Sequence, residues 1–219
     1  MPVIDVYCVN VGNKYGSQYV YKLKTAVEKY LKLPHNFWCI TDKTELYPFS
    51  IQADDLPGYW NKISIFKYTG TCLYFDLDVI IHGNIDMLVS DTLMPYRLIN
   101  PVWKNPSKAK FVKDRPDIGT SLNNSSVMSW SSETKIYEKF MKDPEYYIFK
   151  YDGDDRFLSH ETTFKTFDTD IIYSYRDGAH YKNDNTNFKY RPDYSIALFH
   201  QKPEIHECSD HKIVKDNWI

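Results

Sequence analysis

Strand-like and helix-like runs alternate through the first half of the chain, and this alternation is the feature that most restricts the fold. Three apolar runs have the length of strands, at residues 2–12, 36–42 and 71–83. The segments 17–33 and 59–69, which lie between them, repeat apolar residues at helical spacing. Such βα units build a parallel sheet with helices packed on it. The pattern therefore predicts an α/β fold with a mainly parallel central sheet flanked by helices.

The second half is predicted to be more irregular. Its strand-like segments are 95–103, 122–130, 169–175 and 194–201, and its helix-like segments are 132–143 and 153–167. Residues 104–121 form a loop rich in lysine and proline, of the kind that can cover a site. The chain has no internal repeat and no low-complexity segment, so a single domain is the simplest prediction.

Composition argues against several classes of function. The 27 basic and 29 acidic residues are interspersed, so no basic stripe indicates a nucleic-acid partner. No apolar run has the length of a membrane span, and the N-terminus lacks the features of a signal peptide. The four cysteines form no C-x-x-C pair and are predicted to be reduced and structural. We expect a cytoplasmic protein with no transmembrane segment and no nucleic-acid partner.

Two carboxylates interrupt the apolar segment 71–83. Asp76 and Asp78 are separated by one leucine, so on a strand both side chains point to the same side. Buried carboxylates are costly unless a cation or strong donors face them. Carboxylate oxygens suit Mg²⁺ or Mn²⁺, which commonly share coordination with substrate phosphates. The segment therefore predicts a metal and diphosphate site; alternatively, one aspartate caps a turn and the other is solvated.

A D-x-D sequence after an apolar strand is also the first motif of haloacid-dehalogenase-type phosphatases, in which the first aspartate is the nucleophile. That motif normally ends the first strand of its domain. Here about seventy residues, including two βα units, precede Asp76. Position in the chain therefore favours a metal site over a phosphatase nucleophile.

Four segments, taken in order, carry a resemblance to a known family. They are WNKISIFKYTGTCLYFDLDVIIHGNIDML (60–88), SLNNSSVMSW (121–130), GDDRFLSH (153–160) and FHQKPEIHE (199–207). Together they resemble the metal-dependent glycosyltransferases of the GT-A fold, especially the retaining, family-8-like enzymes. The resemblance covers most of the chain and implies one GT-A, Rossmann-like domain over residues 1–219. Its nucleotide-binding half would be 1–90 and its sugar- and acceptor-binding half 91–219.

The resemblance implies a cofactor, Mn²⁺ or Mg²⁺, held by Asp76, Asp78 and His200. Asp76 would also lie near the nucleoside ribose. The other residues expected to bind the nucleotide and donor are Val9, Asn10, Val11, Tyr15, Asp42, Lys62, Asn124, Ser125 and Lys202. The chain departs from the family pattern next to Lys202, where Gln201 replaces an expected glycine and Glu204 a frequent lysine. That departure weakens the expectation that Lys202 anchors the diphosphate.

The sugar pocket shows two further departures. Asn124-Ser125-Ser126 replaces the family's Asn-Ala-Gly, and Asp154-Asp155 replaces its Asp-Gln. By resemblance, Asp154 would bind sugar hydroxyls and Asp155 would face the anomeric carbon. A carboxylate there can act as a nucleophile or stabilise an oxocarbenium-like ion. In the alternative interpretation, these aspartates only stabilise the N-terminus of the following helix.

The expected function is metal-dependent transfer of a hexose or deoxyhexose, of the glucose, galactose or rhamnose type, from a UDP-sugar to a hydroxyl of a glycan, with retention. The alternatives are a phosphatase with Asp76 as nucleophile and a non-enzymatic carbohydrate-binding module, for which 19 Tyr, 12 Phe and 5 Trp would supply stacking surfaces. Length and motif positions also resemble the N-terminal glycosyltransferase domain of a large chlorovirus-encoded protein. That resemblance implies part of a multi-domain chain in the host cytoplasm.

Overall fold

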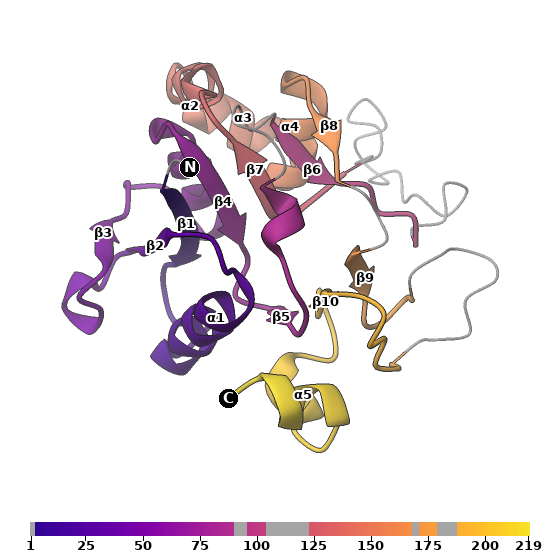
Figure 1. The fold of residues 1–219 in the computed structure, drawn as a ribbon. Helices are drawn as coiled ribbons and strands as arrows, with labels where there is room; N and C mark the ends of the chain where they lie inside the picture. The colour runs from indigo at the N-terminus through magenta and orange to yellow at the C-terminus, as the bar shows by residue number, and fades with distance from the viewer. Residues whose placement is uncertain (1–2, 90–95, 104–122, 168–170, 179–187) are drawn as a thin grey trace.

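A seven-stranded sheet runs through the computed structural model, which describes residues 3–89, 96–103, 123–167, 171–178 and 188–219 (Figure 1). The strand order is β3-β2-β1-β4-β7-β6-β8. Strands β3, β2, β1 and β4 are parallel, β7 is antiparallel to both β4 and β6, and β8 is parallel to β6. The strands are β1 (Ile4–Asn10), β2 (His35–Thr41), β3 (Ser50–Gln52), β4 (Thr71–Phe75), β6 (Arg97–Ile99), β7 (Asn124–Trp130) and β8 (Lys165–Thr166). The predicted mainly parallel α/β fold is confirmed.

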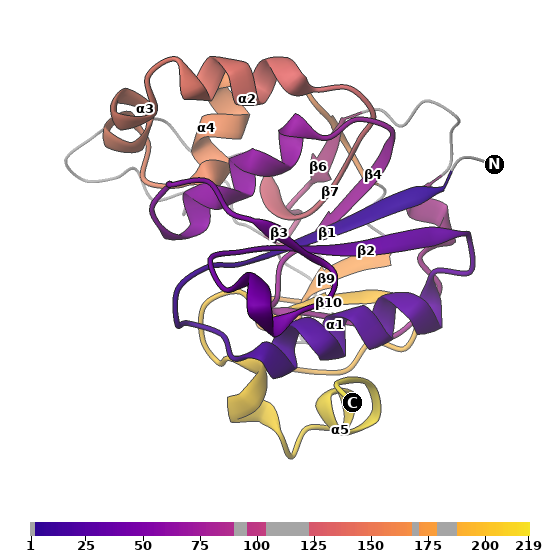
Figure 2. The ribbon, with the colours of Figure 1, turned by 90° about the vertical axis from the view of Figure 1, so that its left-hand side faces the viewer.

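Helices cover both faces of this sheet (Figure 2). One face packs against α1 (Ser17–Tyr30), and the other against η2 (Gly58–Lys67), α2 (Thr134–Met141), α3 (Pro144–Lys150) and α4 (Asp154–Glu161). Alternate residues of β4 belong to the two cores: Leu73 and Phe75 lie on the α1 side, whereas Cys72 and Tyr74 lie on the η2 side. The period of two in a strand therefore decides which side chains meet η2.

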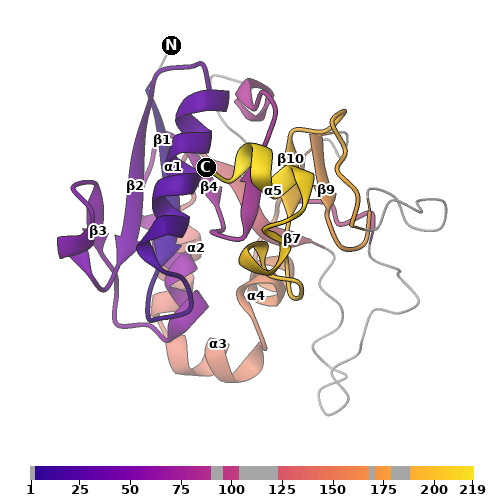
Figure 3. The same cartoon turned by 90° about the horizontal axis from the view of Figure 1, so that it is seen from below.

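A second, three-stranded sheet adjoins the α1 side. Its order is β5-β10-β9, with β5 (Val79–Ile81), β10 (Ile196–Leu198) and β9 (Ile172–Ser174). The C-terminal helix α5 (Lys212–Asn217) lies next to α1 (Figure 3). Lys22 of α1 donates to the Trp218 carbonyl at 2.7 Å, which fastens the C-terminal segment to this face. The remaining short 3₁₀ helices are η1 (Thr44–Leu46), η3 (Asp86–Leu88) and η7 (Ile205–Cys208).

The sequence prediction was wrong for the segment 71–83, which is not one strand. It divides into β4 in the large sheet and β5 in the small sheet, with Asp76, Leu77 and Asp78 in the turn between them. Both strands are fully buried, so the apolar run is continuous although the chain changes sheets. The carboxylates thus sit where the backbone leaves the sheet.

The structure bears on two further expectations and leaves a third untested. All four cysteines are free and buried, as predicted. Among the described residues, no helix is long and apolar enough to cross a bilayer. The predicted loop 104–121 lies outside the described residues.

His82, immediately after β5, gives the fold a pH-dependent stability. Its residue surface is 8% exposed, and neither ring nitrogen has a hydrogen-bond partner in the part of the chain that the structure describes. Burial lowers the pKa of His82 from 6.5 to about 4. The unfolded chain therefore takes up this proton at higher pH than the folded chain does. Folding stability must fall as the pH drops from about 6.5 to about 4.

We expect His82→Phe to lose about 2 kcal/mol less folding stability than the wild type when the pH is lowered from 7 to 5. Phenylalanine fits because the His82 ring lies edge-on to Tyr173 and Tyr190. Urea unfolding at the two pH values measures the difference. His160→Phe, in which an exposed ring stacked on Tyr151 is replaced, serves as the control. Equal pH dependence of His82→Phe and wild type would contradict this assignment.

Candidate functional site

Several of the predicted site residues come together at the carboxyl edge of β4. Strand β7 is antiparallel to β4, so it begins where β4 ends, and the Asp76 N–H donates to the Ser126 carbonyl at 2.8 Å. This pairing brings Ser125, at the start of β7, beside Asp76 in the turn after β4. The first turn of α4 adds Asp154 and Asp155. Three segments far apart in the sequence thus supply one cluster of polar side chains.

Lys62 of η2 lies at the centre of this cluster. Its side chain is 8% exposed, and its Nζ lies 3.0 Å from Asp76 Oδ1 and 3.1 Å from Asp154 Oδ2. It also contacts Ser125 Oγ at 2.9 Å, and that hydroxyl donates to Asp154. Burial alone lowers the pKa of Lys62, but Asp154 and Asp76 outweigh it and raise the pKa above its ordinary value. One buried ammonium therefore joins the predicted metal carboxylate to the predicted sugar carboxylate.

Asp155 and Asp78 complete the acidic cluster. Asp155 Oδ1 accepts from the Ser125 backbone N–H at 2.7 Å, and Asp78 Oδ2 accepts from the Tyr15 hydroxyl at 3.3 Å. Burial and the neighbouring Asp76 carboxylate raise the pKa of Asp78 to about 6. Four carboxylates, those of Asp76, Asp78, Asp154 and Asp155, thus gather around Lys62, whose single positive charge leaves the cluster strongly negative. A bound cation would offset this negative charge.

The carboxylates of the cluster are suitable ligands for a hard divalent cation. The described side chains do not by themselves form a complete metal site. Carboxylate oxygens from Asp76 and Asp78 are the donors that Mg²⁺ and Mn²⁺ favour. In the described part of the chain, no group of three or more His, Cys, Asp and Glu side chains is placed to hold one metal ion. His200, the predicted third ligand, has its Nε2 2.8 Å from Ser174 Oγ and its ring stacked on Trp103. Its role as a ligand stays a prediction.

The residues predicted to bind the nucleoside surround the end of β1. Asn10 is buried and donates to the Tyr47 hydroxyl at 2.8 Å, and the Asp42 carboxylate accepts from the Gly12 N–H at 3.1 Å. Val9 and Val11 are half-buried at the same strand end. The structure places these residues together but tests none of their roles.

Two predicted donor contacts are engaged elsewhere. Asn124 is buried, and its Oδ1 accepts from the Ser126 N–H at 3.0 Å, so its side chain shapes the start of β7. Lys202 is 69% exposed in its side chain and pairs with Glu207 at 2.6 Å. The Lys202 ammonium has three donors, so this pair leaves donors for a further ligand.

Sequence reasoning missed two tyrosines at the site. The Tyr74 hydroxyl donates to Asp76 Oδ1 at 2.6 Å, and the Tyr59 hydroxyl donates to the Asp152 carbonyl at 3.1 Å beside α4. Tyr74 precedes Asp76 by two residues, and this spacing in a strand indicates a shared face. Tyr59 gives no comparable signal, because its contact depends on how η2 and α4 pack.

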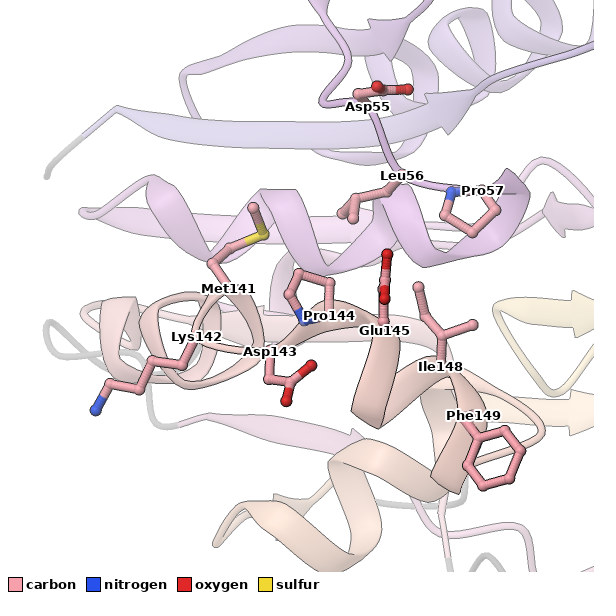
Figure 4. Close-up of a pocket in the computed structure, with 10 residues that line it drawn as sticks. All are labelled: Asp55, Leu56, Pro57, Met141, Lys142, Asp143, Pro144, Glu145, Ile148 and Phe149. Carbon is pink, nitrogen blue, oxygen red and sulfur yellow. The ribbon is translucent and has the colours of Figure 1, made fainter.

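A surface groove of about 760 Å³ lies apart from this cluster (Figure 4). It is lined by the loop before η2 and by the junction of α2 and α3, including Asp55, Leu56, Pro57 and Phe149. It contains none of the predicted site residues. Asp55 in this groove therefore offers a comparison for tests of the carboxylate cluster.

Comparison with solved structures identifies the fold. A structure of the galactosyltransferase LgtC in complex with donor and acceptor sugar analogs has a TM-score of 0.61 at 12% sequence identity, covering 97% of this chain and 93% of that chain. A structure of an active-site mutant of LgtC has a TM-score of 0.63 at 12% identity, covering 92% and 89%. The chain has the GT-A fold. No protein-family model and no curated protein matches the sequence.

The acidic cluster lies at the edge of the sheet where folds of this type bind ligands. In open α/β sheets, ligands bind beyond the carboxyl ends of the parallel strands. Asp76 and Asp78 follow β4 at that edge, and Tyr15 follows β1 at the same edge. The GT-A fold and the cluster therefore point independently to one ligand-binding edge.

Proposed function

We propose that the chain is a metal-dependent glycosyltransferase that moves a hexose or deoxyhexose from a UDP-sugar to a hydroxyl of a glycan. The observation that carries this proposal is the junction made by Lys62, which lies 3.0 Å from Asp76 and 3.1 Å from Asp154. A nucleotide-sugar has a diphosphate next to a sugar, and these two carboxylates are the residues expected to serve the two parts. The GT-A fold, shared with a galactosyltransferase, supports the same conclusion.

Asp76 and Asp78, joined by His200, would hold Mn²⁺ or Mg²⁺. The bound cation would neutralise the diphosphate and stabilise the charge that develops on the leaving nucleotide. The negative charge of the cluster supports a cation at this place, because the half-buried Asp78 lies close to Asp76, and desolvation together with the Asp76 charge raises its pKa to about 6. We propose Lys202 as a second, exposed contact of the diphosphate.

The chain's own groups around the sugar have separate tasks in this proposal. Asp154 accepts hydrogen bonds from sugar hydroxyls, and Lys62 and Ser125 hold its carboxylate in place. Asp155, fixed by the Ser125 N–H, presents a carboxylate toward the anomeric carbon. There it stabilises positive charge on the ring while the acceptor attacks from the face that UDP leaves, or it attacks the anomeric carbon as the bond to UDP breaks, and the acceptor hydroxyl then displaces it. Either route would give retention of configuration. Tyr15, Asn10, Val9, Val11, Asp42 and Asn124 would surround the nucleoside and the donor.

We expect UDP with Mn²⁺ to stabilise the chain against unfolding. At about a hundredfold excess over the dissociation constant, a ligand selective for the folded state raises the free energy of unfolding by about 2.7 kcal/mol. For a chain of this size, that corresponds to an increase in Tm of roughly 5 to 10 °C. Thermal unfolding with UDP alone, Mn²⁺ alone and both together measures the effect. Asp78→Asn should remove the joint stabilisation.

The matched control for this test is Asp55→Asn in the separate groove (Figure 4). It removes an exposed carboxylate and should leave the joint stabilisation intact. Equal stabilisation of Asp78→Asn and wild type would refute the metal and diphosphate proposal. Covalent phosphorylation of Asp76 would instead establish the phosphatase, and glycan binding without nucleotide affinity would establish the carbohydrate-binding module.

A further inference from the structure

Tyr74 is a tyrosine at a position where packing alone requires only a phenylalanine. It lies in β4, is 1% exposed, and faces the core on the η2 side. A buried hydroxyl is costly unless it makes a hydrogen bond. The Tyr74 hydroxyl donates to Asp76 Oδ1 at 2.6 Å, so its partner is a carboxylate of the acidic cluster.

The two oxygens of Asp76 are held unequally. Oδ1 accepts from Tyr74 at 2.6 Å and lies 3.0 Å from Lys62 Nζ. Oδ2 has the longer contact with Lys62, at 3.3 Å. A carboxylate oxygen has about two lone-pair sites, so two donors saturate Oδ1, whereas Oδ2 retains capacity for a further ligand. The side chain is 22% exposed, so a ligand can reach it.

We propose that Tyr74 is a positioning residue: its hydroxyl fixes Asp76 Oδ1 so that the carboxylate offers Oδ2 alone to the cation. The proposal rests on the proposed function, because it assigns Tyr74 a task at the same metal and diphosphate site. Mg²⁺ and Mn²⁺ sites commonly take single oxygens from carboxylates, whereas Ca²⁺ accepts bidentate carboxylates in flexible geometry. Tyr74 thereby favours the smaller cations over Ca²⁺.

The test is Tyr74→Phe, which retains the ring and removes only the donor. The Asp76 carboxylate keeps Lys62 as its partner, so the change leaves no buried charge without a counter-ion. The matched control is Tyr7→Phe. Tyr7 pairs with Tyr74 in register on the neighbouring strand β1, is 3% exposed and stacks on Tyr68. It thus shares the environment of Tyr74 without contacting Asp76.

Mn²⁺ binding is measured in the presence of UDP from the electron paramagnetic resonance signal of the free ion, and Ca²⁺ binding by competition. Relative to wild type, Tyr74→Phe should bind Mn²⁺ about five- to tenfold more weakly, with a smaller loss for Ca²⁺, so that the Mn²⁺ to Ca²⁺ preference falls. Tyr7→Phe should retain both affinities. Urea unfolding of both variants separates this effect from a general loss of stability.

A purely structural role for Tyr74 would lower stability and leave the Mn²⁺ to Ca²⁺ preference unchanged, and this result would overturn the proposal. If Tyr74→Phe keeps the wild-type preference for Mn²⁺ over Ca²⁺ and the wild type binds Mn²⁺ and UDP tightly, the role of Tyr74 is rejected. The proposed function is then retained. Absence of Mn²⁺ binding by the wild type with UDP would reject both.

Discussion

Lys62→Met should lower the free energy of unfolding by about 3 to 5 kcal/mol and reduce the rate of sugar transfer at least about 100-fold. The ammonium of Lys62 is the shared counter-ion of Asp76 and Asp154, at 3.0 and 3.1 Å. Removing it leaves the Asp154 carboxylate, which is 11% exposed, and the half-buried Asp76 carboxylate without that cation. Urea unfolding measures the stability, and release of UDP from a UDP-sugar with Mn²⁺ measures the rate.

The control for Lys62→Met is Lys67→Met, at the end of the same 3₁₀ helix. Lys67 pairs with Asp54 at 2.8 Å, but its side chain is 28% exposed, against 8% for Lys62, so water screens the Lys67 ammonium more strongly. Its loss should cost about 1 kcal/mol and leave transfer unchanged. Losses of similar size for the two variants would mean that the ion pairs of Lys62 stabilise the fold no more than a solvent-screened pair does, and the central role assigned to Lys62 would be wrong.

Local periodicity in the sequence was sufficient for the first two strands of the fold and the helix between them. The predicted helix 17–33 corresponds to α1, and its buried face contains Tyr19, Val20, Leu23, Ala26 and Val27, which repeat at helical spacing. The predicted strands 2–12 and 36–42 correspond to β1 and β2. These elements follow from the sequence because α1 buries one stripe at helical spacing, whereas β1 and β2 are short apolar runs of strand length.

Sequence periodicity did not predict the boundary between two strands that lie in one apolar run. The apolar run 71–83 is buried throughout, so it contains no sign that β4 and β5 belong to different sheets. Helix α3 was not predicted, because none of its seven residues is buried and no apolar stripe marks it. Its N-cap did carry a signal: Asp143 accepts from the Tyr146 N–H, and Pro144 occupies the first helical position.

The candidate site, too, could be predicted from the sequence only in part. Asp76 and Asp78 could be selected from the sequence, because two carboxylates in an apolar run need a counter-charge. The assignments of Lys62 and Asp154 came from family resemblance, and their contact depends on the packing of η2 against α4. The partner of His200, Ser174, lies 26 residues away in the sequence and could not be inferred from local pattern. Tertiary contacts, rather than residue types, set these details.

The helix-capping and catalytic interpretations of Asp155 predict different results for Asp155→Asn. Asparagine keeps the acceptor for the Ser125 N–H and removes the negative charge that we propose faces the anomeric carbon. If the charge stabilises the transition state, kcat should fall by about 100- to 1,000-fold, whereas stabilisation by UDP and Mn²⁺ should persist. Asp152→Asn is the control, because Asp152 precedes the same helix, is 50% exposed and pairs with Arg156. Capping alone would give both variants a stability loss under about 1 kcal/mol and wild-type kcat, and that outcome would remove Asp155 from the chemistry.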